Sequence, residues 1–106
     1  MDIKYNIQIE DTAIEKNLIR ITNQIYKLLP LREEGADWET PLSNIIEEIV
    51  GMKELLLKHQ DLFFSLLCRL EGLYSFKQKE NFLIYRRTIF ECLNLVNEIG
   101  KDVINR

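Results

Sequence analysis

The residue types that most often carry catalysis are few in this chain and stand far apart in the sequence. It has one histidine, His59, next to Lys58 near the end of an expected helix, and two cysteines, Cys68 and Cys92, in apolar surroundings. A zinc site or a nucleophilic triad needs several such side chains at defined spacings. We therefore interpret His59 as structural or neutral and both cysteines as buried free thiols, with a disulfide as the alternative for an exported protein.

The best candidates for metal chemistry are the adjacent carboxylates of Glu47 and Glu48. In fold class the chain resembles the all-helical nucleotide pyrophosphohydrolases of the MazG-like class, and that resemblance implies magnesium held by acidic residues three or four positions apart on two helices. Here the two glutamates point about 100° apart on a helix, and no Glu-x-x-Glu or Glu-x-x-Asp lies inside an expected helix. We predict a protein that is not an enzyme and needs no metal or cofactor, with a metal-dependent pyrophosphohydrolase as the alternative.

Residues 74–87 combine basic and aromatic side chains, as single-strand nucleic-acid surfaces do. The net charge of the chain is nevertheless -3, its pI is about 5.2, and it contains no recognised nucleic-acid motif. A helical nucleic-acid-binding protein is therefore kept as a second alternative. We expect the bases of this segment to face an acidic protein instead.

The charges fall into two opposed blocks. Residues 32–57 carry seven acids against two bases, and residues 58–87 carry six bases against three acids. Such asymmetry can steer a partner or pair one subunit with another. Trp38 lies in the acidic block, where it either packs the loop 30–38 onto the next helix or anchors a partner. The predicted partner-binding residues are Glu33, Glu34, Asp37, Trp38, Lys77, Lys79, Arg86 and Arg87.

Length and composition predict one domain over residues 1–106, because 106 residues with 46% apolar side chains suffice for a single hydrophobic core. No apolar stretch is long enough to span a bilayer. The first residues lack the basic, apolar and small-residue pattern of a secretory signal. We therefore expect a cytoplasmic protein with no membrane segment.

Apolar periodicity predicts helices over residues 12–29, 41–59, 61–73 and 78–104. Thr12 and Glu15 form a capping box for the first helix, which we expect to end before Pro30. Thr40 is the expected N-cap of the second, with Pro41 at its first position. Gly51 in its interior indicates a kink or a close helix contact. The expected stripes are Ile14, Leu18, Ile21, Ile25 and Leu28 in the first helix and Leu42, Ile45, Ile46, Ile49, Met52 and Leu56 in the second.

The fourth helix carries a heptad seam, which favours the interior of a bundle over a free coiled coil. Its members are Phe82, Tyr85, Ile89, Cys92, Val96, Ile99 and Val103. The predicted fold is all-α, a compact four-helix bundle with up-and-down topology.

Two features exceed what a monomeric bundle needs. Residues 1–10 alternate apolar and polar side chains, which predicts a short β-strand or extended arm that has no mate in this chain. Residues 61–73 are apolar on nearly every side, which is typical of a central or interface helix. The predicted dimerisation residues are Ile3, Tyr5, Ile7, Ile9, Phe63 and Phe64.

These patterns together predict an accessory protein that binds and modulates another protein and acts as a homodimer. Its small size and lack of a catalytic constellation are typical of proteins carried by phages or other mobile elements.

Overall fold

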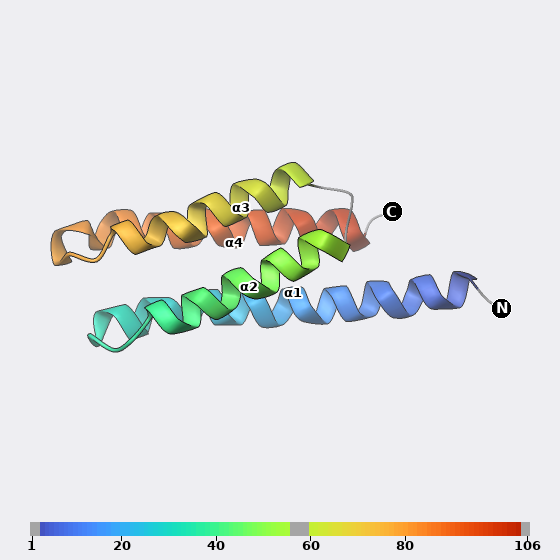
Figure 1. The fold of residues 1–106 in the computed structure, drawn as a ribbon, viewed down its shortest axis with the longest axis horizontal. Helices are drawn as coiled ribbons and strands as arrows, with labels where there is room; N and C mark the ends of the chain where they lie inside the picture. The colour runs from blue at the N-terminus through green and yellow to red at the C-terminus, as the bar shows by residue number, and fades with distance from the viewer. Residues whose placement is uncertain (1–2, 56–59, 105–106) are drawn as a thin grey trace.

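A computed structural model of the chain describes residues 3–55 and 60–104, and side chains within 13–54 and 60–101. The elements in these ranges are all helical, which confirms the all-α class (Figure 1). The α-helices are α1 (Ile3–Glu33), α2 (Glu39–Leu55), α3 (Gln60–Gly72) and α4 (Phe82–Ile104). Two short 3₁₀ turns, η1 (Leu73–Ser75) and η2 (Lys79–Asn81), join α3 to α4.

Consecutive helices run antiparallel, so the chain passes up and down the long axis four times (Figure 1). The helix α1 packs against α2 and α4, and α3 packs against the same two neighbours. This arrangement closes a ring of four helices, which is an up-and-down bundle. The molecule measures 55 × 23 × 19 Å along its principal axes.

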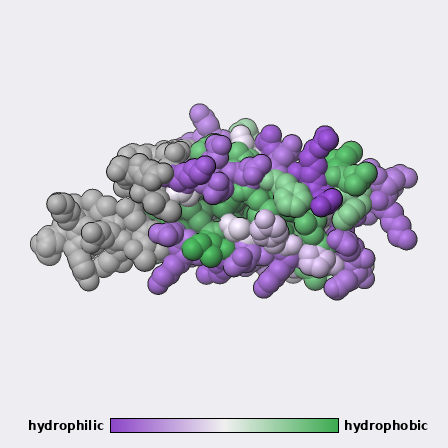
Figure 2. Space-filling view, turned by 180° about the vertical axis from the view of Figure 1, so that it is seen from behind, coloured by the Kyte–Doolittle hydropathy of each residue, from purple (hydrophilic) through white to green (hydrophobic). Residues whose placement is uncertain are grey.

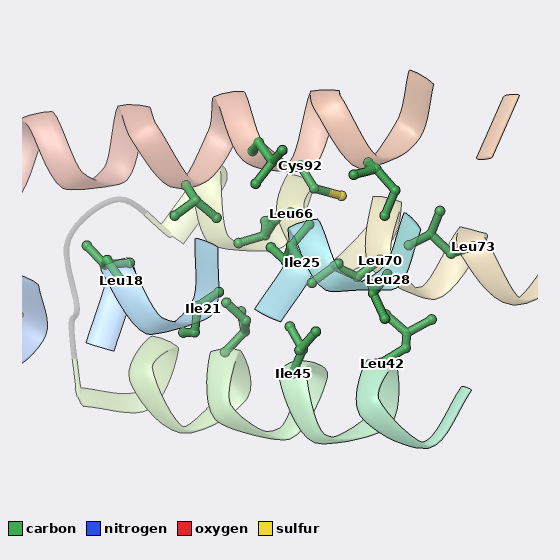
Figure 3. Packing of buried hydrophobic residues seen from close by; sticks show 14 of the residues in the cluster. Leu18, Ile21, Ile25, Leu28, Leu42, Ile45, Leu66, Leu70, Leu73 and Cys92 are labelled. Atoms are coloured by element: carbon green, nitrogen blue, oxygen red, sulfur yellow. The ribbon is translucent and has the colours of Figure 1, made fainter. Parts of the chain in front are cut away.

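The expected apolar stripes form the core between the helices. Leucine, isoleucine and cysteine side chains of the helices and of η1 converge on the bundle axis (Figure 3). On α4 the seam residues Tyr85, Ile89, Cys92, Val96 and Ile99 are buried, and Phe82 is partly buried. On α1 and α2 the stripes are buried except for the partly buried Ile14 and Ile46. Leu56 and the side chain of Val103 lie outside the described residues.

The helix α1 begins at Ile3, and the strand or extended arm expected over residues 1–10 stays a prediction. The side chains of Ile3, Tyr5, Ile7 and Ile9 lie outside the described ones.

The end of α1 differs from the expected one, because the helix continues through Pro30 to Glu33. It stops at Gly35, whose φ of 73° is the left-handed conformation that glycine adopts without strain. The Ala36 amide donates to the Leu31 carbonyl at 2.9 Å and the Gly35 amide to the Arg32 carbonyl at 3.2 Å. These two bonds make a Schellman motif, so Gly35 rather than Pro30 sets the boundary.

The N-cap of α2 is Asp37, not the expected Thr40. Its Oδ1 accepts hydrogen bonds from the backbone amides of Glu39 and Thr40, both at 3.1 Å. Pro41 still lies in the first turn, ahead of the Leu42 amide that donates to the Trp38 carbonyl. Gly51 does not mark a close helix contact, because an added Cβ there would meet no described atom within 4 Å. The kink that was the other expectation for Gly51 stays a prediction.

The helix α3 has one buried face and one exposed face. Phe63, Leu66 and Leu70 point into the core, so Phe63 is a core residue rather than an interface residue. Phe64 is 63% exposed on the outer side. Cys68 is exposed as well, which corrects the expectation that both cysteines are buried.

Candidate interaction surface

The acidic residues predicted to bind a partner do not form one site. Glu33 and Glu34 are exposed at the end of α1, whereas Asp37 is occupied as the cap of α2. Hydrogen bonds from the Thr40 side chain and backbone lower the pKa of Asp37 below its ordinary value, with a smaller contribution from the Glu39 amide. Asp37 therefore stays charged and engaged at the helix N-terminus, where a negative charge is favourable.

Trp38 packs inside the protein and is only 8% exposed. Its ring stacks on Tyr74 with centroids 6.3 Å apart and meets the edge of Tyr85 at 5.1 Å. The side chain thus joins the α1–α2 loop to η1 and α4, and it does not lie on the surface as a partner anchor would.

Arg32 completes this end of the bundle, although sequence reasoning did not single it out. Its Nε and Nη2 donate to the Phe76 carbonyl at 3.2 and 2.6 Å, and Nη2 also donates to the Gln78 carbonyl at 2.7 Å. The guanidinium carbon lies 4.6 Å from the Tyr85 ring centroid and 5.2 Å from that of Phe82. The arginine therefore ties the end of α1 to the α3–α4 connection.

The hydroxyl of Tyr85 is buried and accepts or donates no hydrogen bond within the described residues. Burial raises the pKa of this phenol above its ordinary value, while the nearby Arg32 charge acts in the opposite direction. Tyr85 therefore stays neutral, and its ring serves packing. We call the cluster of Arg32, Trp38, Tyr74, Phe82 and Tyr85 the aromatic joint.

The basic residues predicted to bind a partner are divided between two places. Lys77 forms an ion pair with Glu39 at 3.0 Å beside the aromatic joint. Lys79 is exposed on η2, and Arg86 and Arg87 are exposed on α4. Arg86 places its guanidinium carbon 5.6 Å from the Phe90 ring centroid.

The carboxylates considered for metal binding do not converge. Glu48 pairs with Arg20 of α1 at 3.1 Å, and Glu47 is exposed on α2. Within the described part of the chain, no three His, Cys, Asp or Glu side chains gather as ligands for one ion. His59 lies outside the described residues.

The two thiols occupy opposite environments. Cys92 is buried in the α4 seam, and desolvation raises the pKa of its thiol to about 12, with a smaller opposing effect of the Arg69 charge. Cys68 is exposed on α3. Both are free thiols, so neither closes the disulfide that was the alternative.

A groove of about 660 Å³ runs along the contact of α1 with α4. Its walls include Glu15, Ile19 and Tyr26 from α1 and Leu93, Asn97 and Lys101 from α4. Tyr26 meets the edge of the Phe90 ring with centroids 6.4 Å apart, and both rings are exposed. Figure 2, which shows the bundle from behind, has apolar residues in separate groups among polar ones. We call the groove, together with the Tyr26 and Phe90 rings beside it, the α1/α4 groove.

Sequence reasoning missed this groove because each helix was assigned a single apolar stripe. The signal was present in the spacing of seven between Ile19 and Tyr26, beside the core stripe of the same helix. Exposed rings and aliphatic chains that share one concave surface are typical of an interaction site.

None of the helices in the described ranges combines the length and apolar content needed to cross a membrane. No protein-family model, curated protein or solved structure gives a significant match to the chain, so its function must be argued from its own residues.

Proposed function

We propose that this protein is a non-enzymatic, cytoplasmic accessory protein that binds and modulates another protein and acts as a homodimer. The observation that carries the proposal is the α1/α4 groove, where Ile19 and Tyr26 remain exposed beside a well-filled core and the exposed Phe90 ring contacts Tyr26. Isolated exposed apolar residues are ordinary, but rings and aliphatic chains that share one concave surface favour protein recognition.

A second exposed apolar region supports self-association. Phe64 on α3 is exposed, and Val50 is exposed on α2, the helix that packs against α3. Two of the predicted dimerisation residues, Phe63 and Phe64, have described side chains, and only Phe64 is exposed. We assign it to a second copy of the chain and the α1/α4 groove to the partner protein.

Two measurements test the proposal. Light scattering should give twice the chain mass of 12.6 kDa, and Phe64→Glu should return it to the monomer mass. Affinity purification from the native cell should recover a defined partner with the wild-type chain. A monomer at every concentration, together with no copurifying protein, would show that the proposal is wrong.

A further inference from the structure

The lining of the α1/α4 groove carries one acid and one base, and they come from different helices. Glu15 belongs to α1 and Lys101 to α4. Both side chains are exposed, and neither forms an ion pair or hydrogen bond with another described residue. They lie at the same end of the groove, since a Cβ added at Gly100 would be 3.8 Å from the Leu18 side chain. A protein that covers this end therefore meets a negative charge on α1 and a positive charge on α4.

Beyond the rings of Tyr26 and Phe90, the face continues with the same order of charges. The two ring centroids are 6.4 Å apart, so these parts of α1 and α4 lie side by side. Arg86 of α4 lies over the Phe90 ring. Glu33 follows Tyr26 by seven residues, which places it on the same face of α1. Both charged side chains are exposed. At each end of this face, the acid is on α1 and the base is on α4.

This order of charges is complementary to a second copy of the chain in one orientation. A twofold axis parallel to the bundle places α1 of one copy against α4 of the other, with the same ends together. Glu15 then faces Lys101 of the second copy, and Glu33 faces Arg86 of the second copy. Symmetry repeats each pair, so opposite charges meet at both ends of the contact.

The other possible axis lies across the helices and gives the opposite result. It places α1 on α1 and α4 on α4, with opposite ends together. Glu15 would face Glu33 of the second copy, and Lys101 would face Arg86 of the second copy, so like charges would meet. The charges therefore select the axis parallel to the bundle.

Charges farther from the groove favour neither axis. Under the parallel axis, Lys16 lies near Glu98 of the second copy, which is an opposite pair, but Lys27 lies near Arg87, which is a like pair. Under the other axis, Arg87 lies near Glu98 of the second copy, and Lys16 lies near Lys27. Each orientation thus gains one opposite pair and one like pair.

The apolar side chains of the groove fit the same arrangement. Tyr26 and Phe90 are exposed and lie side by side in one copy, so the parallel axis places the same two rings of the second copy opposite them. Ile19 is exposed two helical turns before Tyr26 and extends the apolar part of the contact. Aromatic side chains are enriched at the centre of protein interfaces, and ring pairs add to the energy of burial.

We propose that a second copy of the chain occupies the α1/α4 groove when the partner protein is absent, through a twofold axis parallel to the bundle. This inference rests on the proposed function, because the groove is the surface assigned there to the partner. It adds a form of regulation, since self-association through the groove and partner binding exclude each other. The contact is separate from the dimer assigned to the Phe64 region. Exposed ion pairs contribute little, so we expect a dissociation constant of about 100 µM, above the concentrations used in light scattering.

The test uses the full chain with Phe64→Glu, so that the groove contact is studied without the other dimer. Sedimentation equilibrium should show a monomer at about 10 µM and mostly a dimer at about 1 mM. Adding Ile19→Glu should abolish this dimer. Adding Glu15→Lys or Lys101→Glu should each weaken it about five-fold or more, because like charges then meet twice.

A mixture of these two charge variants provides the sharpest measurement. In the mixed dimer the introduced lysine faces the introduced glutamate, and Lys101 of one chain faces Glu15 of the other. The mixture should therefore associate as tightly as the Phe64→Glu parent and about five-fold or more tighter than either charge variant alone. An ion pair within one copy cannot produce this result, because neither variant chain keeps an opposite pair at positions 15 and 101.

The matched control is Glu47→Lys, which makes the same charge change at an exposed position on α2 and should alter the dissociation constant less than about two-fold. Fluorescence of the buried Trp38 reports whether each variant is folded. A parent that stays monomeric at about 1 mM, or a mixture no tighter than its components, would overturn the inference. Tighter association of Glu15→Lys alone would show that the copies use the other axis, which also overturns it.

The outcomes separate this inference from the proposed function. If the mixed variants associate as expected but no protein copurifies with the wild type, the groove contact stands and the proposed partner binding is wrong. If a partner copurifies with Ile19→Glu as well as with the wild type, the partner and the second copy use different surfaces and the proposed exclusion is wrong. If the mixture fails to associate but the partner is lost with Ile19→Glu, the proposed function stands and the inference is wrong.

Discussion

In the aromatic joint Arg32 lies over the rings of Phe82 and Tyr85, and beside the α1/α4 groove Arg86 lies over the ring of Phe90, yet the surroundings of these rings differ. Arg32 also donates three hydrogen bonds to the carbonyls of Phe76 and Gln78, and the rings of Trp38 and Tyr85 beside it are buried. Arg86 has only the Phe90 ring among its described contacts, and that ring is exposed. The comparison indicates that the joint serves stability and that the groove is available for binding.

The largest expected effect comes from removing the Trp38 side chain from the aromatic joint. Trp38→Ala should lower the free energy of unfolding by about 3–5 kcal/mol, because it leaves a cavity between the α1–α2 loop and Tyr85. Ile19→Ala in the groove should change it by less than about 0.5 kcal/mol, since Ile19 is already largely exposed. Urea unfolding followed by far-UV circular dichroism measures both. A similar loss of unfolding free energy in the two variants would show that the aromatic joint is no more important for stability than the groove.

The second test exchanges the two arginines for an uncharged side chain of similar length. Arg32→Met should cost about 2 kcal/mol, because the carbonyls of Phe76 and Gln78 lose a charged donor. Arg86→Met should cost less than about 0.5 kcal/mol, since an exposed cation–π contact contributes little. Thermal unfolding of the two variants at the same pH and salt gives the difference. An equal cost would mean that Arg32 contributes no more than a surface side chain.

A smaller contrast concerns two glycines, Gly35 next to the aromatic joint and Gly51 inside α2. Gly35→Ala should destabilise the protein by about 1–2 kcal/mol, because alanine is strained at the left-handed φ of 73°. Gly51→Ala should stabilise it by about 1 kcal/mol, since Gly51 is inside α2 with no atom within 4 Å of an added Cβ. Chemical denaturation of both variants checks the opposite signs. A stabilising Gly35→Ala would contradict the Schellman motif.

Much of the fold could be predicted from the sequence because buried stripes repeat with the helical period. The seam from Tyr85 to Ile99 and the stripe from Leu18 to Leu28 are buried as expected, since nearly every α-helix of a bundle must bury one such face. The boundaries were less predictable. Local propensity favoured a stop before Pro30 and a cap at Thr40, but Gly35 and Asp37 satisfy more backbone groups.

The candidate surface could not be predicted in the same way, because exposure depends on which faces the four helices bury together. Trp38 is buried by Tyr74 and Tyr85, and both come from distant parts of the chain. Ile19 and Phe90 are exposed although their residue types are as apolar as those in the core. Residue type and spacing give the stripes, and only packing decides which of two stripes stays exposed.

The smallest expected effect is electrostatic and concerns the cap beside the joint. The lowered pKa of Asp37 means that its charged form is favoured in the folded protein. The contribution of the Asp37 charge to stability is therefore complete above the ordinary carboxyl pKa and is lost as the pH falls through the lower folded value.

Asp37→Asn keeps an oxygen acceptor and removes the titration. The difference in unfolding free energy between wild type and Asp37→Asn should be constant above about pH 5 and shrink below about pH 4. Urea unfolding across this range measures it, and a difference that does not change with pH would show that the charge of Asp37 adds nothing to the cap.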